Sequence, residues 1–140
     1  MTRVALGFPP SLSAIQAPVR ESLDGVGDEI RRIVISDFDH IEEVNEHLLF
    51  MRGKLFRPTL LLLSSRVGGE DHDETLTLAA VVELVHLATL VHDDAVDHSA
   101  LRRGLPTVNA LWTHQVAVIM GDYLYSRGVS YVEFWTNQGS

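Results

Sequence analysis

The chain has 140 residues, with 11 lysines and arginines against 19 aspartates and glutamates, and its formal net charge is −8 at pH 7. Because 46% of the residues are hydrophobic and 21% are charged, the chain can bury a core, which excludes a disordered solvating segment. The acidic balance excludes a basic nucleic-acid surface, and the absence of cysteine excludes disulfides, thiol nucleophiles and cysteine zinc sites. The length predicts one domain over residues 1–140, and the lack of cysteine and of an export-signal core predicts a cytoplasmic protein.

Helical periodicity dominates the pattern of apolar residues, and no segment alternates over enough positions to predict a sheet. The predicted fold class is therefore all-α. Ser11 or Ser13 is expected to cap a first helix that ends near Leu23, because the glycine-containing stretch 24–27 predicts a break. Later helices are expected to begin near Asp28 and at Asp37 or Asp39, and to cover 57–67, 73–97, 107–112 and 116–134.

The segment 73–97 predicts the central element of the fold. Its middle is apolar on all sides, which is typical of a helix enclosed by other helices. Glu83 and His86 interrupt the apolar run, so the sequence predicts a buried helix and no transmembrane segment.

Three carboxylates, Asp93, Asp94 and Asp97, stand at the end of this helix. Asp93 and Asp97 are four residues apart and share one helical face, with Asp94 on its flank. Carboxylates this close repel one another unless a cation lies between them, and hard oxygen ligands without cysteine suit Mg²⁺. The alternative is a solvated acidic helix end.

Two basic segments point to an anionic ligand. Arg102 and Arg103 follow the carboxylates in a loop, and Lys54 and Arg57 stand at a junction between a loop and a helix. Guanidinium groups and the amides of a helix N-terminus both bind phosphate, although surface ion pairing would also explain the arginines.

His86 lies seven residues before Asp93 and so on nearly the same helical face. A histidine in an apolar helix is usually a hydrogen-bonded core residue, but this alignment favours a place in the site. His92 and His98 flank the carboxylates and are interpreted as neighbours of the site and not as ligands.

Four motifs together resemble those of the trans-type prenyl diphosphate synthases, the polyprenyl synthetase family. They are Gly-Lys-x-x-Arg-Pro at 53–58, Glu-x-x-His at 83–86, Asp-Asp-x-x-Asp at 93–97 and Arg-Arg-Gly at 102–104. Their order and spacing are similar to the family's, and the likeness extends over roughly residues 30–130. The resemblance implies the isoprenoid synthase fold, of which this chain would be the N-terminal half.

The resemblance also implies which residues bind substrate. The diphosphate of isopentenyl diphosphate would be held by Lys54, Arg57, His86 and Arg103. Arg102 would contact the allylic diphosphate. No protein nucleophile is implied.

For catalysis, the resemblance implies that Asp93 and Asp97, supported by Asp94, bind Mg²⁺ that bridges to the allylic diphosphate. Metal and Arg102 would stabilise the departing diphosphate, the isopentenyl double bond would attack the allylic carbocation, and a proton would be lost.

Product length is expected to depend on Ala88 and Thr89, five and four residues before Asp93. An aromatic ring there would close the cavity floor, as in short-chain members of the family. These small side chains predict a longer product, around octaprenyl.

The family's second aspartate-rich motif is absent from the sequence, and residues 128–140 look atypical of the family. We therefore expect little or no turnover by the chain alone, and a homodimer, a heterodimer or a separate C-terminal half as partner. The alternatives are a non-catalytic small subunit of a heterodimeric synthase and, suggested by His92-Asp93, a metal phosphohydrolase of the HD type.

Overall fold

The structure is a computed structural model that describes residues 9–36, 38–51, 53–69 and 73–138. The elements in chain order are α1 (Leu12–Gln16), a 3₁₀ turn (Ala17–Val19), α2 (Arg20–Val34), α3 (Asp39–Phe50), α4 (Phe56–Val67), α5 (Asp73–Val96), β1 (Leu101–Arg102), β2 (Leu105–Pro106), α6 (Val108–Leu111) and α7 (His114–Gln138). The prediction of an all-α fold is confirmed, with one short hairpin added.

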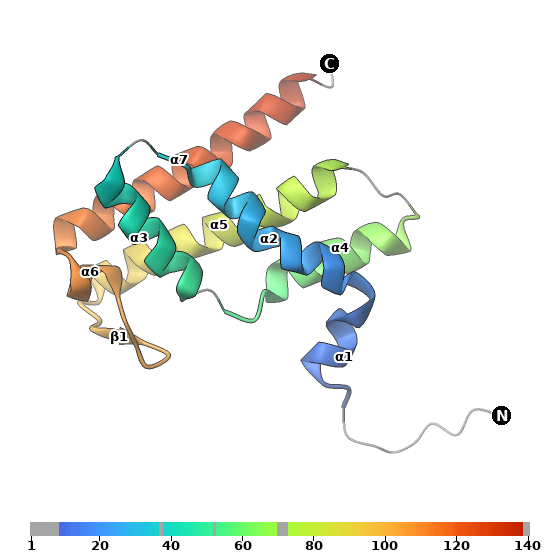
Figure 1. Ribbon diagram of the computed structural model, residues 1–140, viewed down its shortest axis with the longest axis horizontal. Coiled ribbons are helices and arrows are strands. Elements are labelled where there is room, and N and C mark those ends of the chain that lie inside the picture. The colour runs from blue at the N-terminus through green and yellow to red at the C-terminus, as the bar shows by residue number, and fades with distance from the viewer. Residues whose placement is uncertain (1–8, 37, 52, 70–72, 139–140) are drawn as a thin grey trace.

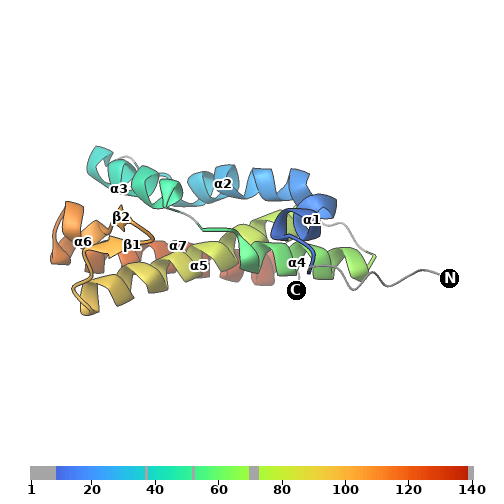
Figure 2. The same cartoon turned by 90° about the horizontal axis from the view of Figure 1, so that it is seen from below.

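The helices lie in two layers (Figures 1 and 2). The lower layer contains α5 with α4 and α7 packed along it, and the upper layer contains α2 and α3. The β1–β2 hairpin and α6 lie at the C-terminal end of α5. Helix α5 therefore packs against α4 and α7 in its own layer and against α2 in the other layer, as expected of a central element.

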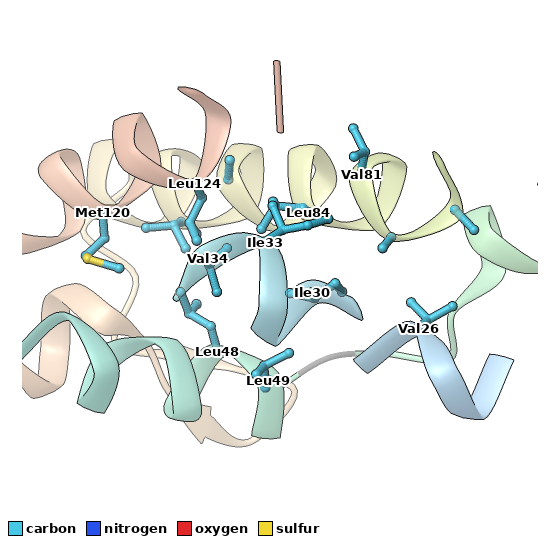
Figure 3. Close-up of a cluster of buried hydrophobic side chains, with 14 of the residues drawn as sticks. Val26, Ile30, Ile33, Val34, Leu48, Leu49, Val81, Leu84, Met120 and Leu124 are labelled. Atoms are coloured by element: carbon cyan, nitrogen blue, oxygen red, sulfur yellow. The ribbon is translucent and has the colours of Figure 1, made fainter. Parts of the chain in front are cut away.

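The core lies between α2, α5 and α7 (Figure 3). Ile30 and Ile33 of α2 meet Leu84 of α5 and Leu124 of α7, and all four are at most 2% exposed. Small residues bring the helices of the lower layer together. A Cβ on Gly121 of α7 would come within 2.2 Å of the His92 ring.

The segment Glu74–Val96 is long and apolar enough to cross a membrane by length and composition alone, with a mean hydropathy of 1.6. Half of that stretch is buried inside the protein. This burial is typical of the core helix of a soluble fold.

The predicted break at residues 24–27 is wrong, because α2 runs through it without interruption. Two glycines weaken a helix by about 1 kcal/mol each, but Leu23, Val26 and Ile30 bury one face of α2. A Cβ on Gly25 would already contact Leu76 of α5 at 3.6 Å. The first helix ends earlier, at Gln16, where Pro18 enters the 3₁₀ turn.

Three further boundaries differ from the prediction. Phe38 is the N-cap of α3, so Asp39 is its first helical residue, and Asp37 lies outside the described residues. The loop 101–106 forms the two-stranded hairpin, in which Leu101 pairs with Pro106 and Arg102 with Leu105. Helix α7 begins at His114 and continues to Gln138, beyond the predicted end at Phe134.

Candidate functional site

A pocket of about 360 Å³ gathers the basic residues that the sequence analysis selected. It lies between α1, the loop before α4, the middle of α5 and the hairpin. Its polar lining consists of Lys54, Arg57, Glu83, His86, Arg102 and Arg103. All five predicted diphosphate-binding residues therefore face one hollow, although they come from three separate segments.

The loop that carries Lys54 has an unusual backbone. Leu55, the N-cap of α4, is left-handed with φ 57° and ψ 39°, and no side chain caps this end of the helix. The N–H groups of Phe56 and Arg57 lie at the positive end of α4 and have no partner within the helix, which favours an anion. Sequence analysis placed these residues correctly at a junction between a loop and a helix.

The hairpin that carries the two arginines is closed by Arg103 and Gly104, both with positive φ, at 50° and 79°. Positive φ at both central residues is typical of a tight two-residue hairpin turn, and it explains why glycine follows the arginines. The Arg103 guanidinium lies against Gly53, where an added Cβ would be 2.8 Å from Nη1. Gly53 thus leaves room for Arg103 at the pocket wall.

His47 of α3 fixes the hairpin from the other layer. Its Nε2 donates to the carbonyl oxygen of Pro106 at 2.8 Å, and its ring meets Trp112 edge-on. No local pattern in the sequence indicates this role of His47, because its partner is 59 residues away.

Asp94 does not point toward the other two carboxylates. It is buried, and both of its oxygens accept hydrogen bonds of 2.8 Å from Nε and Nη2 of Arg102. This two-pronged pairing orients the guanidinium and raises the pKa of Arg102 above its ordinary value. Asp94, which was expected on the flank of Asp93 and Asp97, is therefore paired with an arginine.

Asp93 and Asp97 are both exposed at the C-terminal end of α5. The helix ends in a Schellman motif: Ser99 N–H donates to the carbonyl of Asp94, and His98 N–H to that of Ala95. His98 takes the left-handed position with φ 52°. Among the described residues, no group of three or more histidine, aspartate or glutamate side chains is arranged to hold a metal ion.

His92, beside these carboxylates, faces α7. Its Nε2 lies 3.1 Å from Oδ1 of Asp122 and 3.2 Å from the carbonyl of Val118. The ring therefore ties α5 to α7.

His86 is half-buried at the centre of the basic pocket. Its burial lowers its pKa below the ordinary 6.5, and the charges of Arg57, Arg102 and Arg103 lower it further. The neutral imidazole is therefore favoured more strongly than in an ordinary histidine.

The two residues expected to control product length lie in different surroundings. Ala88 is 1% exposed and belongs to the core. Thr89 is exposed, and its hydroxyl donates to the carbonyl of His86 at 2.7 Å. Neither lines the basic pocket.

Comparison with known proteins gives the family context. A sequence profile described as polyprenyl synthetase matches residues 38–137. The chain is 39% identical to a heptaprenyl diphosphate synthase component 2 of Geobacillus stearothermophilus, over 84% of this chain and 37% of that protein. It is 42% identical to a geranylgeranyl diphosphate synthase of Saccharolobus solfataricus, over 76% of this chain and 32% of that protein.

Among solved structures, a polyprenyl synthase from Caulobacter crescentus CB15, complexed with calcium and isoprenyl diphosphate, has a TM-score of 0.83. The identity is 34%, over 96% of this chain and 40% of that one. The chain therefore spans about a third to two fifths of the length of these relatives.

Proposed function

Because the chain belongs to the polyprenyl synthetase family and has an incomplete isoprenoid synthase fold, we propose that it is the N-terminal part of a prenyltransferase that condenses isopentenyl diphosphate with an allylic diphosphate. The observation that carries this proposal is the pocket that collects Lys54, Arg57, His86, Arg102 and Arg103. A diphosphate needs several cations at once, and an acidic protein supplies them here in one place.

The basic residues divide between two diphosphates in this proposal. Lys54, Arg57, His86 and Arg103 would hold isopentenyl diphosphate, while Arg102, oriented by Asp94, would contact the allylic diphosphate. Arginine forks suit phosphate oxygens, and the unpaired amides of α4 add donors.

Asp93 and Asp97 would hold Mg²⁺ on the allylic side. Two exposed carboxylates one turn apart fit this ion, because it takes few protein ligands and completes its shell with water and phosphate oxygens. When bound, the ion would supply positive charge to the leaving diphosphate. The Caulobacter relative was solved in complex with calcium and isoprenyl diphosphate, which supports the use of a divalent cation together with a diphosphate.

In the reaction, the C–O bond of the allylic diphosphate breaks, the double bond of isopentenyl diphosphate attacks the allylic carbon, and one proton leaves. The part of this chain is to hold both diphosphates and to stabilise the negative charge that develops on the departing one through Arg102. The proposal keeps a long-chain product, for which the small side chains at Ala88 and Thr89 are the argument from sequence, and it keeps a cytoplasmic location.

Turnover requires, in our proposal, a second acidic motif that this chain lacks, supplied by a C-terminal part or by another subunit in a dimer. A non-catalytic small subunit of a heterodimer is the second candidate, and the name component 2 of one relative supports only that a second component takes part. The exposed pair Asp93 and Asp97 favours the first candidate, since a purely regulatory subunit has no need of it. We do not propose a phosphohydrolase, because the described residues offer no cluster of histidine and carboxylate ligands.

The test is binding of isopentenyl diphosphate to the chain by calorimetry, followed by turnover with farnesyl diphosphate and Mg²⁺, alone and with a C-terminal half from a relative. We expect binding by the chain, and product only in the combined sample. Arg57→Met should weaken binding, whereas Arg66→Met, at the exposed far end of α4, should not. Equal binding by both variants would contradict the proposal.

A further inference from the structure

Gln16 is a buried polar residue that belongs to none of the motifs and lies outside the matched range 38–137. Its side chain is the one buried side chain of α1. The amide nitrogen Nε2 donates to the carbonyl oxygen of Lys54 at 2.8 Å and to Oγ1 of Thr59 at 3.0 Å. A primary amide has two N–H donors, so both are used on one short segment of chain.

The two acceptors flank the left-handed Leu55. On one side is the carbonyl of Lys54, and on the other is Thr59, whose N–H and hydroxyl both donate to the carbonyl of Leu55, at 3.0 and 2.7 Å. A leucine with positive φ is sterically disfavoured and persists only where its surroundings fix it. Gln16 therefore clamps the strained residue from outside.

The same segment presents the cations to the pocket. Lys54 and Arg57 stand on either side of the strained turn, and Gly53 lies under the Arg103 guanidinium. A shift of this backbone would move Lys54 and Arg57 and the surface against which Arg103 rests.

We propose that Gln16 is a positioning residue for the diphosphate site, which acts by holding residues 53–59 in the conformation that directs Lys54 and Arg57 into the pocket. The identity of the ligand rests on the proposed function. The role of Gln16 rests on the hydrogen bonds of the loop and is measurable without a ligand.

The first experiment measures amide hydrogen exchange at residues 53–57 in Gln16→Met, a substitution that keeps the length of the side chain and removes both donors. We expect exchange there about tenfold faster than in the wild type, after correction for global stability measured by circular dichroism. Ile15→Ala, at the exposed neighbouring position, is the control and should exchange like the wild type. Unchanged exchange in Gln16→Met would overturn the proposal.

Thr59 provides a second route if Gln16→Met does not fold. Thr59→Ser keeps the hydroxyl that links Gln16 to Leu55 and should behave like the wild type. Thr59→Val keeps the volume but removes this link, so exchange at residues 53–57 should increase. Equal exchange in the two Thr59 variants would overturn the proposed clamp.

The second experiment measures pyrophosphate affinity by calorimetry. We expect Gln16→Met to weaken it by about tenfold, as is typical when a group that orients a binding residue is removed. Lys54→Met should cost less in the Gln16→Met background than in the wild type, because Lys54 is already displaced. Additive losses would indicate a merely structural role and would overturn the proposal. Absence of pyrophosphate binding by the wild type would contradict the proposed function, and hydrogen exchange alone would then decide the role of Gln16.

Discussion

The basic and acidic sides of the candidate site differ in how far this chain alone organises them. On the basic side, Gln16, Asp94 and His47 fix the loop and the hairpin that carry the cations. On the acidic side, Asp93 and Asp97 are exposed on the last turn of α5. In the proposed function, this chain would therefore organise the phosphate side by itself, whereas the metal side would depend on oxygens that a ligand brings.

The largest expected effect is a loss of pyrophosphate affinity when two cations of the basic side are removed. In the double variant Lys54→Met/Arg57→Met, pyrophosphate affinity should fall by at least about a hundredfold, because each charged hydrogen bond contributes roughly 1.5–3 kcal/mol. Both side chains are exposed, so the folded state should persist. Calorimetry with and without Mg²⁺ measures the loss, which should appear in both conditions. A loss confined to the Mg²⁺ sample would contradict this prediction, because it would mean that Lys54 and Arg57 belong to the metal-dependent side of the site.

The next variant tests the difference between two adjacent carboxylates. Asp94→Asn should lower the free energy of unfolding by about 2 kcal/mol, since it removes the charge of a largely buried carboxylate that is paired with Arg102. Asp93→Asn, at the exposed neighbour, should change it by less than about 0.5 kcal/mol. Urea denaturation followed by circular dichroism compares the two. Similar losses would mean that Asp94 does not hold the hairpin.

The helices and the composition of the pocket follow from local sequence. The residues of α5 are apolar on all sides, which predicts a core helix, and the basic pairs Lys54/Arg57 and Arg102/Arg103 predict an anion site. Pairings across long separations are not encoded locally. Gln16 reaches a partner 38 residues away, and nothing in its own helix indicates which one.

The same reasoning explains why the partner of Asp94 could not be predicted. Helical spacing puts Asp93, Asp94 and Asp97 near one another, but successive residues point about 100° apart. Asp94 turns inward to Arg102, which lies only eight residues away but reaches it because of the hairpin. The glycines at 24–27 led to the wrong prediction of a helix break for a similar reason. Burial of one face of α2 outweighed their low helix propensity.

The acidic side is tested by adding and removing magnesium. With two carboxylates available, Mg²⁺ should raise the pyrophosphate affinity of the isolated chain by only about threefold to tenfold, which is at most about 1.4 kcal/mol. Asp93→Asn/Asp97→Asn should abolish that increase and leave the metal-free affinity unchanged or slightly higher, because two negative charges are removed. Calorimetric titrations in Mg²⁺ and in a chelator measure both quantities. A large Mg²⁺ effect that persists in the double variant would mean that the metal binds to residues other than Asp93 and Asp97.

The smallest expected effect on stability comes from His86, which reports on the electrostatic field of the basic pocket. Burial and the charges of Arg57, Arg102 and Arg103 lower its pKa in the folded chain below the ordinary 6.5. Between the lowered pKa and 6.5, the unfolded chain therefore binds more protons than the folded chain. The free energy of unfolding should fall as the pH drops through that window and recover above it. His86→Gln should remove this part of the acid sensitivity in urea denaturation at pH 5 and 7.5.

Ligand binding should reverse the effect at the same histidine. A diphosphate bound beside His86 brings negative charge that offsets the three arginines, so the pKa of the imidazole should rise and a proton should be taken up near pH 6. Calorimetry of pyrophosphate binding in two buffers with different ionisation enthalpies measures this uptake, and the difference between wild type and His86→Gln removes the contribution of the ligand's own titration. Equal proton uptake by the two chains would show that the bound anion does not reach His86. His86 would then not belong to the basic side of the site.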